Sequence, residues 1–146
     1  MTPRTILSAA VGGIILMGCA YSLPSVMSTR DCNGQHCEVA VSAKPHDATG
    51  FSCFVDRVDP YELVVNHPRP VTVNWYLDSG SDHDGYRFTD AGIVFDDPTG
   101  WKCGPLASNT RFQCINTAVQ GRHKYTVNLV KGSTRCEPYD PYVVNP

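Results

Sequence analysis

The strictest alternation of apolar and polar residues in this chain runs from residue 70 to residue 77. Strict alternation of β-branched and aromatic residues with polar ones is the pattern of a β-strand that buries one face. Trp75 gives the apolar face of this segment its largest surface, and we therefore expect other strands to pack over it. The apolar face consists of Val71, Val73, Trp75 and Leu77.

A two-residue period also marks several other segments. The 11 prolines and 12 glycines of the chain favour turns over long helices, and no segment after residue 18 has a helical period. The segments 86–88 and 93–95 predict two short strands, or one bent strand with a bulge near Gly92. The remaining strands are expected at 38–43, at 51–55 with Phe51 facing inward, and at 61–65, 110–115, 122–130 and 139–145.

Short strands separated by turns predict an all-β fold in which two sheets pack face to face. We expect an antiparallel Ig-like sandwich. With 146 residues, of which 42% are hydrophobic, the chain can form one domain with its own core. The formal charge of −2 and the scattered positions of the 12 basic residues argue against binding to nucleic acid.

The strand at 70–77 leads into the most polar segment of the chain, Asp-Ser-Gly-Ser-Asp-His-Asp-Gly at 78–85. We expect an exposed loop there, and a loop held by a rigid strand is a common place for function. Exposed tyrosines beside it suit a contact with an envelope protein or a glycan. The candidate contact residues are Tyr76, Asp78, Asp82, His83, Asp84 and Tyr86.

The same loop raises the alternative of divalent-cation binding, because residues 82–85 resemble part of a calcium-binding loop. In that motif the first ligand position falls on Gly80 and the twelfth on Ala91, and neither side chain can coordinate a metal. A solvated acidic turn is therefore the favoured interpretation. The five histidines are spread singly along the chain and no G-x-S-x-G sequence occurs, so we expect neither catalysis nor a cofactor.

The N-terminus has the pattern of an export signal. Arg4 is followed by an apolar stretch at 6–17, which is too short to span a bilayer as a helix. It ends in Leu-Met-Gly-Cys at 16–19, which resembles the lipobox of bacterial lipoproteins. The resemblance implies cleavage before Cys19, acylation of its sulfur and new amino group, and, with Ala20 following, a place in the outer membrane facing the periplasm. Two or three acyl chains anchor a protein stably.

An ordinary signal peptide that releases a soluble periplasmic or secreted protein is the alternative. The polar and aperiodic composition of residues 20–31 is typical of a linker. The predicted organisation is therefore a lipoprotein signal peptide at 1–18, a lipidated tether at 19–31 and a sandwich domain at 32–146.

The cysteines fit an exported protein. Seven are present, and acylation of Cys19 leaves six, which can pair in many ways. A metal site around His36 is a weaker alternative, since no second cysteine pair matches the spacing there. Spacing favours disulfides between Cys103 and Cys114, between Cys32 and Cys37, and then between Cys53 and Cys136.

The order of a tryptophan strand, a loop and a late Tyr-x-Val-x-Leu strand at 125–129 is similar to that of cupredoxins, so cupredoxin-like topology is the alternative to the Ig-like one. A cupredoxin copper site needs two histidines, a thiolate and usually a methionine. The corresponding loop, 131–137, has Cys136 but no histidine or methionine, so we expect no copper site. The chain also resembles a loose group of exported bacterial proteins without an assigned activity, at 73–77, 85–95 and 140–145.

Together these patterns predict a non-catalytic envelope lipoprotein whose domain binds or braces a periplasmic component. One alternative is a divalent-metal-binding protein that uses the loop at 78–85. Another is an immunity-type or inhibitor lipoprotein that captures a secreted partner.

Overall fold

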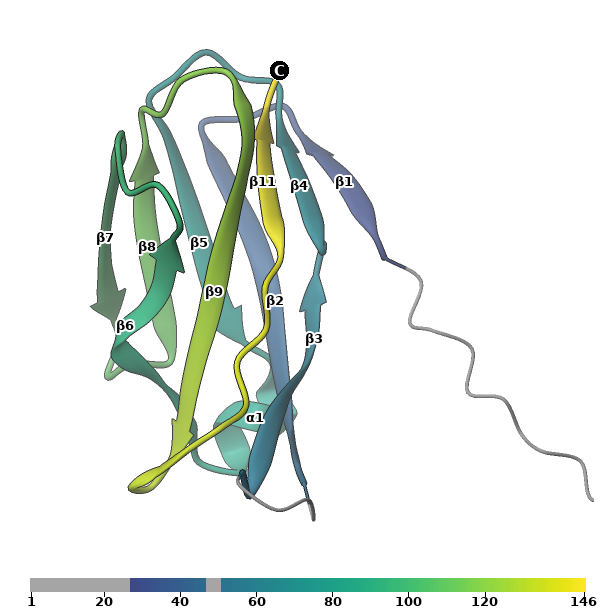
Figure 1. The fold of residues 1–146 in the computed structure, drawn as a ribbon, viewed down its shortest axis with the longest axis vertical. Coiled ribbons are helices and arrows are strands. Elements are labelled where there is room, and N and C mark those ends of the chain that lie inside the picture. Colours follow the sequence, from purple (N-terminus) through teal and green to yellow (C-terminus); the bar gives the residue numbers. More distant parts are fainter. Residues whose placement is uncertain (1–26, 47–50) are drawn as a thin grey trace, which may run out of the picture.

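The computed structural model describes residues 27–46 and 51–146. The predicted signal peptide, Cys19 and most of the predicted tether lie outside the described residues. Two β-sheets pack face to face, and a short helix lies at one end of them (Figure 1). The all-β sandwich predicted from the sequence is confirmed. The described residues contain no helix that is long and apolar enough to cross a membrane.

One sheet has six strands and the other has five. In the six-stranded sheet the order is β1 (Thr29–Cys32), β4 (Glu62–Val65), β11 (Tyr142–Asn145), β9 (Gly121–Lys131) and β10 (Thr134–Arg135), and β6 (Tyr86–Phe95) also pairs with β9. In the five-stranded sheet the order is β3 (Cys53–Asp59), β2 (His36–Pro45), β5 (Val71–Leu77), β8 (Arg111–Asn116) and β7 (Trp101–Leu106). The tryptophan strand β5 is therefore the centre of its sheet.

Most strand pairs are antiparallel, but β1 with β4, β11 with β4, and β2 with β5 are parallel. The sequence predicted an antiparallel sandwich, and these three parallel pairs depart from that prediction. Parallel neighbours need a crossover connection. Here the chain leaves β2 through β3 in the same sheet, passes through β4 in the other sheet, and returns to β5. Turn signals mark where such strands end, but they do not show which sheet the next strand joins.

The core is organised by a contact between the two sheets. Trp75 of β5 and Tyr125 of β9 are both fully buried, and the Trp75 Nε1–H donates a 3.0 Å hydrogen bond to the Tyr125 hydroxyl. Their rings meet edge to face, with centroids 5.3 Å apart. Burial raises the pKa of Tyr125, so the hydroxyl stays protonated and brings no charge into the core. The prediction that other strands pack over Trp75 is confirmed.

Two strands depart from simple alternation. β6 is one strand whose register shifts at a bulge, which confirms the second of the two predicted arrangements. Gly92 lies at this bulge, where a Cβ would come within 2.7 Å of the Phe112 ring. In β3 the pairing begins only at Cys53, so Phe51 is 40% exposed and does not face inward as predicted.

The predicted boundary between the tether and the domain, at residue 31, is too late in the chain, because residues 28–31 belong to the domain. Residues 29–31 belong to β1, which pairs with β4. Ser28 also contacts the domain, because its hydroxyl donates to Asp59 Oδ1 at 3.0 Å and its carbonyl accepts from the Glu62 N–H at 3.0 Å. The backbone groups along the edge of β4 bind a segment whose own sequence shows no alternation.

Three disulfides link the strands, and they are the pairs that spacing favoured: Cys32–Cys37, Cys53–Cys136 and Cys103–Cys114. The Cys53–Cys136 bond closes the largest loop, with a sequence separation of 83, and the chain-entropy description gives it a stabilisation of about 4.5 kcal/mol. It lies where the chain after β10 bridges the sheets, because Glu137 forms backbone hydrogen bonds with β3 and Tyr139 forms them with β9. One long side of the sandwich is therefore closed.

The variant Tyr125→Phe tests the hydrogen bond between the sheets. It leaves the buried Trp75 Nε1–H without an acceptor, so we expect the free energy of unfolding to fall by about 1–3 kcal/mol. Tyr76→Phe, on the outer face of β5, is the matched control and should change it by less than about 0.5 kcal/mol. Urea denaturation with intact disulfides measures both variants, and equal losses would contradict the assigned role of Tyr125.

Candidate functional site

Residues 78–85 contain a short helix where the sequence predicted a loop. Helix α1 (Ser79–His83) begins after Asp78, whose Oδ1 accepts a 2.7 Å hydrogen bond from the Ser81 N–H. Aspartate is a favoured residue at this position because its carboxylate satisfies a free N–H of the first turn. Glycine is a poor helix former and serine a modest one, so the composition of the segment predicts a loop. The capping residue Asp78 was the one local signal for a helix.

Helix α1 takes the place of β5 beside β2, because β2 continues beyond the end of β5. The Asp78 N–H donates to the Val41 carbonyl at 2.9 Å, and the Ala43 N–H donates to the Ser81 Oγ at 2.9 Å. Ser81 is the buried residue of α1. Its hydroxyl therefore satisfies a backbone donor of β2 that has no strand to pair with on the side where β5 has ended.

A bulge in β3 turns two consecutive charged side chains outward. The register between β2 and β3 shifts at this point. Asp56 and Arg57 lie outside the core, whereas Val55 before them and Val58 after them are buried. A bulge adds one residue to a strand and so reverses the alternation beyond it. The adjacent polar pair in Val-Asp-Arg-Val is the sequence signal for this bulge, and the predicted strand at 51–55 stopped short of it.

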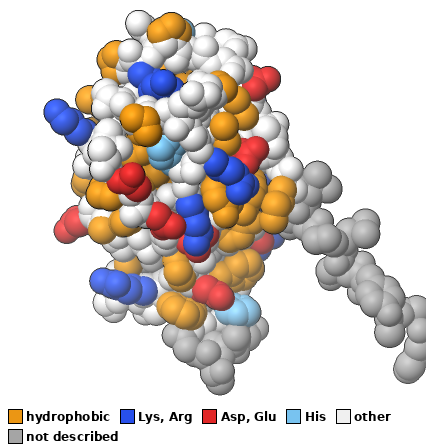
Figure 2. All heavy atoms as spheres, turned by 45° about the horizontal axis from the view of Figure 1, so that its top comes forward, with side chains coloured by type: hydrophobic (Ala, Val, Ile, Leu, Met, Phe, Trp, Pro, Cys, Tyr) orange, Lys and Arg blue, Asp and Glu red, His pale blue; other side chains and the backbone are white. Residues whose placement is uncertain are grey.

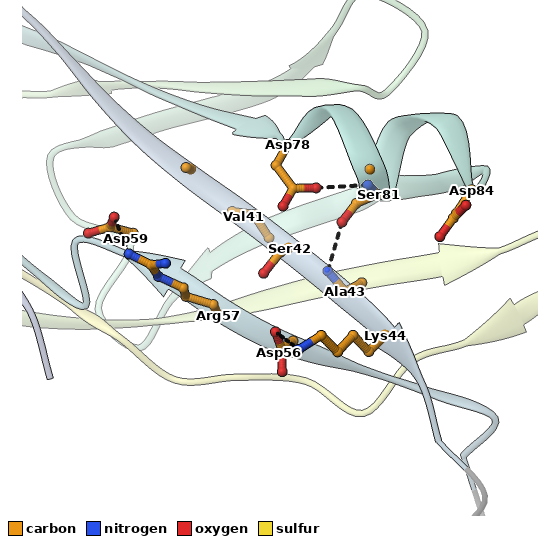
Figure 3. A pocket seen from close by; sticks show the side chains of 12 residues that line it. Val41, Ser42, Ala43, Lys44, Asp56, Arg57, Asp59, Asp78, Ser81 and Asp84 are labelled. Carbon is orange, nitrogen blue, oxygen red and sulfur yellow. Dashed lines mark hydrogen bonds and ion pairs between the residues drawn. The ribbon is translucent and has the colours of Figure 1, made fainter. Parts of the chain in front are cut away.

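An open hollow of about 570 Å³, which we name the α1 groove, lies between the helix and this bulge. In Figure 3, β2 passes along the middle of the groove, with side chains of α1 on one side and side chains of β3 on the other. None of the described residues that line it is aromatic. They are Ala40, Val41, Ser42, Ala43, Lys44, Asp56, Arg57, Asp59, Asp78, Gly80, Ser81 and Asp84.

Charged side chains dominate the α1 groove. Four aspartates against one lysine and one arginine leave a formal charge of −2. Lys44 Nζ lies 2.9 Å from Asp56 Oδ2, and the Arg57 guanidinium lies 2.6 Å from Asp59 Oδ2. These ion pairs are partly exposed and contribute little to stability, but they hold the long cationic side chains along one wall.

The other two carboxylates of the groove are in different situations. The Asp78 carboxylate accepts the hydrogen bond from the Ser81 N–H at the N-terminus of α1. Asp84, at the end of α1, is exposed, and its carboxylate lies 3.7 Å from the exposed ring of His83, which carries a charge only when protonated. Asp84 is therefore the carboxylate of the groove that is most available to a donor from outside.

The structure places five of the six predicted contact residues in two groups. Asp78 and Asp84 line the groove, and Tyr76 is next to it because it pairs with the lining residue Ala40. Asp82 and His83 lie on the exposed face of α1, where the Asp82 carboxylate binds Arg87 at 2.8 Å. The sequence did not indicate the lysine, arginine and aspartates of the opposite wall, because they lie far from the helix along the chain.

Tyr86 was predicted to be a contact residue, and this was wrong. It is fully buried at the start of β6. The prediction treated Tyr86 as part of the exposed loop, whereas β6 begins at this residue and turns it toward the core. Lys131 Nζ lies 4.8 Å from the centre of its ring, so the side chain is also covered by a neighbouring strand.

The described residues contain no group of three His, Cys, Asp or Glu side chains that is placed to hold a metal ion. The carboxylates of the α1 groove are spread over two sides, and two of them form ion pairs with the side chains of Lys44 and Arg57. His36 lies beside the closed Cys32–Cys37 disulfide, so the thiolates of a metal site are not present there. No contact among the described residues favours the metal-binding alternative.

The variant Ser81→Ala tests how α1 is held on β2. It removes the acceptor of the Ala43 N–H, so we expect the free energy of unfolding to fall by about 1–3 kcal/mol. Ser79→Ala, at an exposed position of the same helix, is the control and should change it by less than about 0.5 kcal/mol. Hydrogen exchange of the Ala43 amide should become faster in Ser81→Ala alone. An unchanged exchange rate would show that this hydrogen bond does not hold the helix.

Comparison with known proteins does not identify a family for this chain. No protein-family model matches the chain, and no curated protein matches it significantly.

Proposed function

We propose that this chain is a lipid-anchored protein of the bacterial envelope whose sandwich domain is a non-catalytic, protein-binding module. The resemblance of residues 16–19 to a lipobox supports the anchor. The three disulfides account for six of the seven cysteines and leave Cys19 for acylation. Disulfides are typical of exported proteins in an oxidising compartment.

The α1 groove is the observation that carries the binding function. Hydrogen bonds between α1 and β2 hold the helix in place, and ion pairs along β2 and β3 orient the charged side chains of the groove. A site that is already formed loses little entropy when a partner binds. The groove thus combines a fixed shape with polar groups that can orient a partner.

The chemistry of the groove favours a protein partner over a glycan. Sugar rings commonly stack on aromatic side chains, and none of the described lining residues is aromatic. The formal charge of −2 favours a partner surface with lysine or arginine that can reach Asp84. A resident envelope protein and a secreted protein captured by an immunity-type lipoprotein both fit this description.

Labelling with radioactive palmitate tests the anchor. We expect incorporation into the native chain and none into Cys19→Ser, because serine offers no sulfur to acylate. Ser22→Ala lies in the same segment and should be labelled normally. A native chain without label would refute the anchor and would leave the binding function of the domain unaffected.

Charge reversal in the α1 groove tests the binding function. We expect a protein from envelope extracts to be retained by the native chain and lost with Asp84→Lys, since the new charge repels a basic partner surface. Glu38→Lys makes the same change at an exposed position of β2 outside the groove and should retain the partner. Quantitative mass spectrometry of the retained proteins measures the difference. Retention that Asp84→Lys leaves unchanged would contradict the groove as the binding site.

A further inference from the structure

The two long sides of the sandwich are built differently. On one side the chain after β10 bridges the two sheets, and Cys53–Cys136 links it to β3. On the other side β6 and β7 are edge strands of different sheets that lie next to each other (Figure 1). The described residues show no strand pairing between them. This second side is therefore open.

Contacts near the two ends hold the open side together. At one end the Phe88 N–H donates to the Asn109 carbonyl at 2.8 Å, and Asn109 Nδ2 donates to the Phe88 carbonyl at 3.0 Å. At the other end the rings of Phe95 and Trp101 stack with centroids 3.7 Å apart. The bulge of β6 lies between these contacts. A hollow of about 190 Å³, which we name the side pocket, opens there.

The side pocket is apolar at its base, which is formed by Ile93, Phe95, Trp101 and Phe112. Sites for cofactors and drug-sized ligands have volumes of about 300–1,000 Å³, and this pocket is smaller. Its volume suits a single large apolar side chain. Val94, which also lines the pocket, is 45% exposed, so the apolar surface continues onto the outside of β6.

One carboxylate lines the pocket and two more are its neighbours along the chain. Asp90 is a lining residue, and Asp96 and Asp97 lie between the lining residues Phe95 and Pro98 in the turn that follows β6; we call these three aspartates the rim. In the described part of the chain these three aspartates form no ion pair, whereas five of the ten other carboxylates pair with lysine or arginine. Figure 2 shows acidic and basic side chains interspersed over one face of the molecule.

The nearby groups do not neutralise this rim. Hydrogen bonds from Thr99 hold the pKa of Asp97 below its usual range, so this carboxylate is ionised at neutral pH. Lys124, which approaches Asp96, binds Asp140 instead, with Nζ and Oδ2 2.9 Å apart. Lys124 thus compensates Asp96 only in part, and the rim offers net negative charge to a partner.

The backbone of β7 is a poor alternative for a contact at this side. Pro105 lies within this edge strand and has no N–H to donate, and proline on an edge strand disfavours the addition of another strand. The pocket and its charged rim are therefore the features that can recognise a partner.

We propose that the side pocket binds a basic peptide segment of a partner protein, which inserts one large apolar side chain. The apolar base would hold that side chain, and the three aspartates would contact lysine or arginine on either side of it. β7 and β3 are opposite edges of the five-stranded sheet, so this surface is separate from the α1 groove, and its test does not depend on the function proposed for that groove.

Nuclear magnetic resonance with a short peptide tests the proposal. The chain has two tryptophans. The Trp75 indole is buried and bound to Tyr125, whereas Trp101 lines the pocket and its indole N–H has no partner in the described residues. We would titrate Ac-Lys-Phe-Lys-NH₂ into the ¹⁵N-labelled full chain carrying Cys19→Ser, so that no acyl chain competes for the pocket. The Trp101 indole signal should shift, and the Trp75 signal should stay in place.

Matched peptides and variants separate the apolar and the charged parts of the site. Ac-Lys-Ala-Lys-NH₂ should bind about tenfold more weakly or worse, because it fills no pocket. Ac-Glu-Phe-Glu-NH₂ should not bind, because the rim repels it. Asp90→Asn should weaken binding of the first peptide about twofold to fivefold, and Asp84→Asn on α1 should have no effect.

Three results would overturn the proposal. The first is an unshifted Trp101 signal with Ac-Lys-Phe-Lys-NH₂ at a concentration of about 10 mM, which is about tenfold above a Kd of 1 mM. The second is equal binding of the three peptides. The third is equal or tighter binding of phenol alone, which would show that the pocket holds small apolar molecules and does not recognise a basic segment.

Discussion

The hydrogen bond between Trp75 and Tyr125 is the constraint on which the structure depends most. It joins the two sheets at a depth where neither group can reach water. A buried N–H without a partner costs about 1–3 kcal/mol, so the two strands are held in the one alignment that forms this bond. Asn116 and Asn145 make a second buried link between the sheets, with a 2.8 Å hydrogen bond between their side chains.

Once the sheets are aligned, a difference in strand length creates the candidate site. β2 runs past the end of β5, and the Ala43 N–H there is satisfied by the Ser81 hydroxyl of α1. On the other side of β2, a bulge turns Asp56 and Arg57 outward. The α1 groove is thus a consequence of how β2 completes its hydrogen bonds after its neighbours end or shift.

The same alignment also makes the two long sides of the sandwich unequal. The segment after β10 closes one side, and the Cys53–Cys136 disulfide fixes it. At the other side the bulge of β6 keeps two edge strands from meeting along their length, and Gly92 allows the close approach of the Phe112 ring there. The protein therefore has a polar groove at a strand end and an apolar pocket at its open side.

The sequence by itself determined most strands, because a strand that buries one face must alternate. The cysteine spacing only ranked the possible disulfides, and the structure confirms the favoured set. The sequence did not determine the α1 groove. Asp56, Arg57 and Asp84 line one groove only because the chain crosses to the second sheet between β2 and β5, and no local pattern records that crossing. The tertiary structure also decided the fate of Tyr86, since the residue at which β6 begins sets which side chains face the core.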